Sequence, residues 1–309
     1  MTKKYTTPPP QIDIVKFVPE LAPLARTTVR LHPHRTKRDS KPDTSKIAGL
    51  FLWPEHEPWP MYEEHNAPYV PVVQLRKDDF PEIAFKPGTD LFQLLWTPYR
   101  EDSTFLPIPK TFWRKASEVK HPLKKIPALE DYGVDTEDID VSDNVPKMCS
   151  VYPERVVEYP DLDELRWANN EVNAPIYEKI VKAKFTFGKK TREEAQSQMS
   201  DEDWRHVLYG CYLSVCPGAK VGGGFPRVDE NGKTWELLLT IPSWEFDRGS
   251  AARWLPLEDR PKEKGEELFN LTVDALLNPM GMDLGRTQRV QIRICRELPD
   301  WPIQMDIMG

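Results

Sequence analysis

The sequence predicts an α+β fold that is internally duplicated and consists of mostly antiparallel β-sheets with a few flanking helices. The first observation is compositional: 31 prolines and 10 tryptophans occur in 309 residues. Prolines placed between short apolar runs punctuate strands more readily than long helices. The second observation is a Lys-(Ile/Val)-(Ala/Gly)-Gly block that occurs twice, at 46–49 and at 220–223.

Each copy of this block begins a series of similar segments in the same order. An apolar run, an acidic-aromatic pair and a strand-like segment follow the first copy at 70–75, 79–80 and 91–96, and the second at 237–241, 245–246 and 290–295. The offset between the copies changes from 174 to 166 and then to 199, as insertions in connecting loops would produce. A duplicated fold has a groove between its halves, which is a natural place for a ligand or partner.

This comparison divides the chain into a lead-in and one domain. The lead-in is a tail with a short extended element at 1–45, and the domain at 46–309 contains both repeats. The first repeat occupies about 46–120, a partly helical connection about 121–210, and the second repeat about 211–309.

Strands are expected where β-branched and aromatic residues gather. The predicted strands are 27–31, 69–75, 91–96, 111–114, 225–228, 234–241 and 288–295. The Asn231-Gly232 pair predicts a tight hairpin because both residues can adopt positive φ. In the last segment, Arg or Gln alternates with Val or Ile, so one face is apolar and the other is wet.

Two segments have helical patterns. Ser200 begins an N-cap pattern with an acid three residues later, and apolar residues follow at helical spacing up to Gly210. An apolar stripe at 266–277 is closed by Asn278-Pro279.

Composition excludes several classes. The net charge of −7 argues against a nucleic-acid binder, because phosphate contacts need clustered Lys and Arg. The sequence has no apolar run long enough for a membrane helix and no secretory signal, so we expect a cytoplasmic protein without a membrane partner. The four cysteines are too few to staple this chain and are expected to be buried free thiols.

Two segments have opposite charge. Basic residues gather between Arg26 and Lys46, and we interpret this segment as a solvated approach to the first repeat. An acidic stretch at 130–143 contains no basic residue. It is expected to be an exposed loop and a possible contact surface for a basic partner.

The most unusual short segment reads Trp53-Pro-Glu55-His-Glu57-Pro-Trp59-Pro60. One interpretation is an aromatic clamp or carboxylate site, because indole rings offer large contact areas and Glu can act as acid and base. The other is a proline-stiffened turn whose rings cap the sheet. The second is favoured, because nothing in the spacing makes Glu55 and Glu57 converge.

Common catalytic and cofactor motifs are absent from the sequence. No zinc-binding spacing is present, so no metal is expected. The glycines at 222–224 do not match a phosphate-binding loop and are better explained by close strand packing. No nucleophile elbow or catalytic cysteine signature occurs, and we expect no cofactor.

The ordered blocks resemble the YwqG-like family of uncharacterised bacterial proteins. The resemblance covers most of 46–295 and rests on 46–49 with two Trp-Pro units, the segments 74–75, 79–81 and 91–96, the segment 153–160, and 220–223 with Pro226. It implies a duplicated α+β fold, and similar domains in some toxin loci are thought to act as immunity proteins. Many relatives have a C-x-x-C pair where this chain reads Met61-Tyr-Glu-Glu-His65, so a metal role for that pair is not carried over. A Gly-Asp-x-Gly turn of the relatives is likewise replaced at 282–286.

The leading hypothesis is a non-enzymatic binding protein, an immunity-type inhibitor of a basic toxin. Complementary charge would speed the encounter, and the predicted contacts are Trp53, Glu55, Glu57, Trp59 and the acidic stretch.

The alternative is an enzyme or small-molecule-binding protein that uses the cleft between the repeats. Its polar candidates are Lys46, Arg114, Glu154, Glu158 and Lys220. An enclosed pocket with convergent carboxylates and a raised Glu pKa would favour this alternative, whereas a flat acidic face with exposed tryptophans would favour a protein partner.

Overall fold

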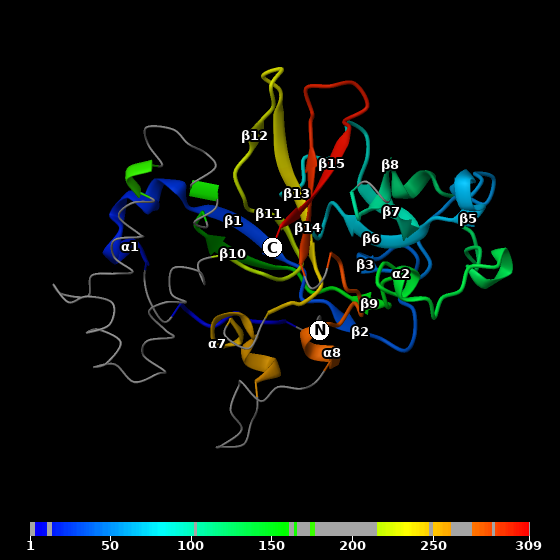
Figure 1. Ribbon diagram of the computed structural model, residues 1–309, viewed down its shortest axis with the longest axis horizontal. Coiled ribbons are helices and arrows are strands. Elements are labelled where there is room, and N and C mark those ends of the chain that lie inside the picture. The colour runs from blue at the N-terminus through cyan, green and yellow to red at the C-terminus, as the bar shows by residue number, and fades with distance from the viewer. Residues whose placement is uncertain are drawn as a thin grey trace.

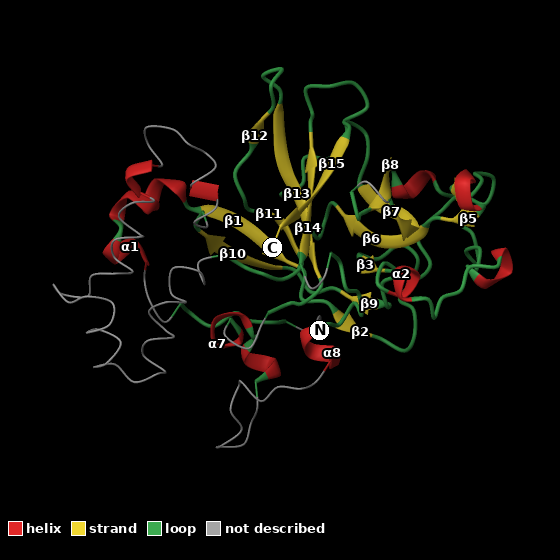
Figure 2. Cartoon of the chain, viewed as in Figure 1, coloured by secondary structure: helices red, strands yellow, loops and turns green. Residues whose placement is uncertain are grey.

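The structure, a computed structural model, describes residues 4–10, 14–101, 104–160, 164–165, 174–176, 215–246, 250–260, 274–285 and 288–308. Over these residues the fold is α+β, as predicted, with several antiparallel sheets and few helices. Figure 2 shows the short helices around the strands.

The first sheet, sheet A, has the strand order β10-β1-β11-β13-β14-β15, and β12 pairs with β13 outside this path. The strands are β1 (Arg26–Arg30), β10 (Glu154–Glu158), β11 (Lys220–Gly222), β12 (Arg227–Val228), β13 (Thr234–Pro242), β14 (Arg289–Ile294) and β15 (Ile303–Met308). The second sheet, sheet B, has the order β2-β9-β3-β6-β7-β8. Its strands are β2 (His34–Arg35), β3 (Lys46–Ile47), β6 (Val70–Arg76), β7 (Leu91–Arg100), β8 (Pro107–Arg114) and β9 (Cys149–Ser150).

Smaller elements surround the two sheets. A two-stranded sheet joins β4 (Met61–Tyr62) to β5 (Ala67–Pro68), and Figure 1 places it at the far side of sheet B. The α-helices are α1 (Ile14–Phe17), α2 (Ile139–Ser142), α7 (Ala251–Trp254) and α8 (Asp274–Leu277). The 3-10 helices are η1 (Pro19–Leu24), η2 (Glu63–His65), η3 (Ala116–Glu118), η4 (Glu130–Tyr132) and η5 (Leu257–Asp259).

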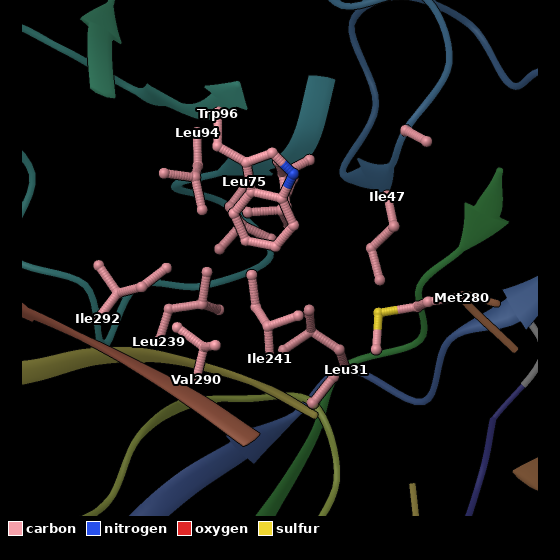
Figure 3. Packing of buried hydrophobic residues seen from close by; sticks show 14 of the residues in the cluster. Leu31, Ile47, Leu75, Leu94, Trp96, Leu239, Ile241, Met280, Val290 and Ile292 are labelled. Atoms are coloured by element: carbon pink, nitrogen blue, oxygen red, sulfur yellow. The ribbon is translucent and has the colours of Figure 1, made fainter. Parts of the chain in front are cut away.

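The main core lies between the two sheets. Figure 3 shows Leu94 and Trp96 of β7 facing Leu239 of β13 and Ile292 of β14. All four side chains are fully buried, with 0% exposure, so each sheet buries its inner face against the other. The space between the sheets is therefore an apolar core, which corrects the expectation of a polar cleft between the halves.

Most predicted strands are confirmed. The segments 27–31, 69–75, 91–96, 234–241 and 288–295 coincide with β1, β6, β7, β13 and β14, and 111–114 forms the end of β8. The hairpin at Asn231-Gly232 is also confirmed, because Gly232 has φ 75° and β12 pairs with β13 across the turn. The predicted helix at 200–210 lies outside the described residues, and only α8 of the predicted helix at 266–277 is described.

The two sheets repeat the same pairing. Lys46 lies opposite Gln74 in sheet B and Lys220 lies opposite Thr240 in sheet A, which agrees with offsets of 174 and 166. The third offset is wrong by one residue: Gln74 lies opposite Gln93 and Thr240 opposite Gln291, an offset of 198. A slip of one residue would exchange the two faces of the strand. The recurrent pairing supports an internal duplication, which stays a prediction.

The irregularities of the strands recur as well. The register shifts between Pro71 and Val73 in sheet B and between Leu237 and Leu239 in sheet A, at equivalent positions. Such bulges bend a strand and increase its twist.

Strands that complete the sheets come from outside the predicted repeats. β1 and β2, in the predicted lead-in, enter sheets A and B, and β9 and β10, in the predicted connection, enter sheets B and A. The interpretation of 26–46 as a solvated approach is therefore wrong for 26–35, which supplies β1 and β2. Between β2 and β3 no strand forms, and Lys37, Arg38 and Lys41 are exposed, as expected.

Candidate functional site

The outward face of sheet A carries a continuous row of polar side chains. Residues directly opposite one another across the six strands of the main path are Glu154, Arg30, Lys220, Thr240, Gln291 and Asp306. We call this set the polar row. It lies on the face opposite the apolar core because side chains alternate along each strand. Its four central members are at most 6% exposed, and buried polar groups of this kind need partners.

In sheet B, the chain itself supplies hydrogen-bond partners for the equivalent row of polar side chains. Its three central members are Lys46, Gln74 and Gln93. The Gln74 amide donates to the carbonyl oxygens of Pro42 and Thr44, and its oxygen accepts from the backbone N–H of Leu52. These hydrogen bonds fix the loop that covers sheet B, so this row has a structural role.

The lysines of the twin blocks each meet a carboxylate. Lys46 Nζ lies 2.9 Å from Asp39 Oδ1, and Lys220 Nζ lies 2.9 and 2.8 Å from the two carboxylate oxygens of Glu158. A Cβ built on Gly49 would lie 2.6 Å from Asp39, and one on Gly223 would lie 2.6 Å from Glu158.

One glycine of each block is explained by the ion pair. The glycine three residues after each lysine adopts positive φ, 75° in the first block and 77° in the second, and leaves room for the carboxylate. The preceding residue also has positive φ in both blocks, at Ala48 and Gly222. The expectation of close strand packing is confirmed at Gly223, whose near neighbours are the Glu158 carboxylate of β10 and the Thr28 side chain of β1.

In sheet A the same row borders a pocket. Its lining includes Arg26, Glu158, Lys220, Thr240, Arg289 and Gln291. Thr240 is 0% exposed, yet its hydroxyl has no hydrogen-bond partner among the described residues. The Nε of Arg26 is also buried and unbonded within the described part of the chain, while its guanidinium lies 4.3 Å from the Phe225 ring centroid.

At the other end of the polar row lies a buried ionic cluster. Glu154 Oε2 lies 2.7 Å from His32 Nε2 and 4.0 Å from Arg30 Nη1. Burial of the carboxyl raises the pKa of Glu154, but hydrogen bonds from His32 and Thr7 outweigh it and lower the value to about 2. Burial lowers the pKa of His32 to about 4. At neutral pH the His32 imidazole is therefore neutral, and it contacts the ionised carboxylate of Glu154.

Glu245 is a second buried carboxyl near this face. It is 4% exposed, and its Oε1 accepts from the backbone N–H of Ala219, at 3.0 Å. Burial raises the pKa of Glu245 to about 7. Its counterpart in sheet B is Asp79, which accepts from Ser45 Oγ at 2.5 Å. In each sheet, this acid accepts a hydrogen bond from the residue that precedes the lysine of the twin block.

The predicted partner-binding residues do not form a surface. Trp53 is 0% and Trp59 is 8% exposed, and their ring centroids lie 4.9 Å apart in a cluster under sheet B. Glu57 binds both Nη atoms of Arg114 at 2.6 Å, and only Glu55 of the two glutamates is exposed. The contact hypothesis for these tryptophans is therefore corrected: they cap the sheet, the interpretation that the proline-rich spacing favours.

The predicted cleft residues separate into two groups. Lys46 and Arg114 belong to sheet B, whereas Glu154, Glu158 and Lys220 belong to sheet A. Only the second group shares one buried face. Thr240, Gln291 and His32 were not predicted, although the alternation of polar and apolar residues in β13 and β14 indicates which side chains face outward.

Cys149, Cys216 and Cys295 are buried free thiols, as predicted, and Cys211 lies outside the described residues. Among the described residues, no three His, Cys, Asp or Glu side chains are grouped so that they could hold a metal ion. None of the described helices has the length and apolar character needed to cross a membrane.

No protein-family model matches the chain, and a search of curated proteins found no match.

Proposed function

We propose that the protein binds a small acceptor-rich molecule, a carboxylate or a phosphate ester, in the pocket on the outward face of sheet A. The observation that carries this proposal is the Thr240 hydroxyl at the pocket wall, which has no partner among the residues that the structure describes. Leaving a buried polar group unbonded costs about 1–3 kcal/mol, so such groups generally bond to water or to a ligand. In sheet B the equivalent Gln74 is fully occupied by the chain itself.

The groups around the pocket define the ligand class. Lys220 and Glu158 neutralise each other. Arg26, Arg289 and Glu164 also line the pocket, and the Nε of Arg26 is unbonded within the described residues. A guanidinium donor beside a hydroxyl matches carboxylate or phosphate oxygens.

The test compares two threonines on the same face. Thr28 and Thr240 are both 0% exposed, but Thr28 Oγ1 already donates to the Val221 carbonyl oxygen at 3.1 Å. Binding to the purified chain is screened by thermal shift with acetate, amino acids, inorganic phosphate and nucleoside monophosphates, and hits are measured by calorimetry. Thr240→Val should weaken binding about tenfold or more, equivalent to ~1.4 kcal/mol, without loss of stability. Thr28→Val should leave affinity unchanged while lowering stability.

Arg26→Gln supplies the second arm of the test, because it removes the guanidinium donor. Arg155→Gln is its control, since Arg155 lies on the neighbouring strand β10 but pairs with Glu82 at 2.7 Å. Equal affinities for Thr240→Val and the wild type, or no hit in the panel, would count against the pocket as a ligand site.

A protein partner is a second candidate, and one observation favours it. The acidic stretch at 130–143 is mostly exposed, and it includes Tyr132 at 40% and Ile139 at 69% exposure. Exposed apolar groups within an acidic surface suit a basic protein partner. The immunity-type role therefore stays a prediction that now depends on this stretch and Glu55 rather than on the tryptophans. Binding of basic ribonucleases, measured with and without charge reversal at Asp135 and Glu137, tests it.

A further inference from the structure

Residues 5–8 lie across the buried ionic cluster as an extended peptide, which we call the strap. The strap belongs to no strand of either sheet. The hydrogen bonds described below come from four elements: β10, β1, α7 and η5. Four charged side chains, those of Glu154, Arg30, Arg253 and Glu258, form hydrogen bonds with it. This arrangement is the recognition pattern of a bound peptide.

Thr7 is the most fully recognised residue of the strap. Its backbone N–H donates to Glu154 Oε1 at 2.7 Å, and its hydroxyl donates to Glu154 Oε2 at 2.5 Å. The same hydroxyl accepts from Arg30 Nη1. A carboxylate and a guanidinium therefore both hydrogen-bond a serine or threonine hydroxyl at this position, and an apolar residue of the same shape would leave both groups without this bond.

The neighbouring residues are bound through hydrogen bonds to their backbone groups. The Thr6 N–H donates to Glu258 Oε2 at 2.7 Å, and the Thr6 carbonyl accepts from the Leu257 N–H at 2.9 Å. The Pro8 carbonyl accepts from Arg253 Nη1. These contacts fix an extended backbone, which proline at this position also favours.

An aromatic pocket holds the first residue of the strap. Tyr5 is 2% exposed, and its ring centroid lies 4.1 Å from that of His34, 5.0 Å from that of Tyr152 and 5.5 Å from that of His32. Rings packed in this way provide a large apolar contact area. His32 has φ 44°, a conformation uncommon for residues other than glycine.

We infer that these residues form a binding site for an extended peptide that contains an aromatic residue, then any residue, then Thr-Pro, and that the chain's own residues 5–8 fill it in this structure. The cis segment is present at a high effective concentration, in the millimolar range for short connections. It therefore excludes a peptide of the same sequence unless the strap is weakened.

The experiment uses the full-length chain and a fluorescent peptide with the sequence of residues 4–10. The wild-type chain should show no measurable binding below about 1 mM, because the strap competes in cis. The Thr7→Val chain loses both side-chain hydrogen bonds of the strap and should bind the wild-type peptide at least tenfold more tightly. A peptide that carries the same Thr7→Val change should bind this chain at least tenfold more weakly. Pro9→Ala, at an exposed position, is the matched chain control and should behave as wild type.

Hydrogen exchange at the Leu257 amide makes each outcome decisive, since this amide donates to the strap. Faster exchange in the Thr7→Val chain together with peptide binding supports the site. Faster exchange without peptide binding would overturn it, because the groove would then be open and unable to recognise the peptide. Unchanged exchange would overturn the role of the Thr7 hydroxyl. If the Thr7→Val chain does not fold, Tyr5→Ala loosens the strap at its other end and is read in the same way.

Discussion

Removing the lysine from each twin block should have very different effects on stability. Lys220→Met leaves the carboxylate of Glu158 without its cation at 3% side-chain exposure. Lys46→Met leaves Asp39, whose side chain is 29% exposed. Methionine keeps most of the apolar stem, so the comparison isolates the charge.

The magnitudes follow from the exposure of the remaining carboxylate. Breaking a buried pair so that one charge stays buried costs about 3–5 kcal/mol. Asp39 can be hydrated and still accepts from the Leu50 N–H, so its loss of Lys46 should cost about 1 kcal/mol. We expect Lys220→Met to be more destabilising by about 2 kcal/mol or more.

The assay is urea unfolding followed by tryptophan fluorescence, with the free energy of unfolding taken by linear extrapolation. A double variant, Lys220→Met with Glu158→Gln, tests the cause, because glutamine keeps an acceptor for the Cys216 N–H that Glu158 now satisfies. It should recover about half of the loss. Equal costs for the two single lysine variants, or no recovery in the double variant, would refute the reasoning.

The remaining predictions concern pH and an aromatic contact. Burial raises the pKa of Glu245 to about 7, so its contribution to stability is full below its ordinary 4.5 and is lost as pH rises to 7; Glu245→Gln should remove this fall. Burial lowers the pKa of His32 to about 4, so its contribution is present above 6.5 and is lost as pH falls to 4. Between about pH 4.5 and 6.5 the two groups change stability with pH in opposite directions. In this range the urea midpoint of Glu245→Gln should rise with pH, because only the His32 contribution remains. The midpoint of His32→Asn should fall with pH, because only the Glu245 contribution remains. An unchanged profile in either variant contradicts the assignment. Arg114→Lys removes the bidentate bond to Glu57 and the guanidinium that lies 4.2 Å from the Trp53 ring centroid. It should lower the free energy of unfolding by about 2 kcal/mol in the same urea assay. A loss below about 0.5 kcal/mol, the range of ordinary surface substitutions, would show that these contacts contribute little.

Much of the fold could be predicted because local patterns and the global structure agree. The alternation in β14 and the Asn231-Gly232 turn are signals carried by a few adjacent residues. The third repeat offset failed by one residue because both strands are rich in apolar side chains, and only the pairing with β6 and β13 fixes the register.

The candidate site could be predicted only in part, because its members are distant in sequence. Glu158 and Lys220 were identified, yet nothing in the sequence indicates that they pair across 62 positions. The Trp53 segment misled for a related reason: a carboxylate between two tryptophans can be an exposed clamp or a capped turn. The choice depends on Arg114, which comes from a distant strand and binds Glu57 in the fold.

The differences between the two sheets bear more on the proposed function than their likeness does. Both sheets share the lysine ion pair, the two residues of positive φ and the strand bulge, so these features are explained by the architecture alone. What differs is the group opposite the lysine: Gln74 is bonded to the chain's own loop, whereas Thr240 faces a pocket and its hydroxyl has no partner within the described part of the chain. A buried unpaired hydroxyl lowers stability, and a cost carried in one half of the fold but not in the other is expected where binding requires it. This difference supports the proposed functional face on sheet A, in the half opposite to the one that the paired tryptophans indicated.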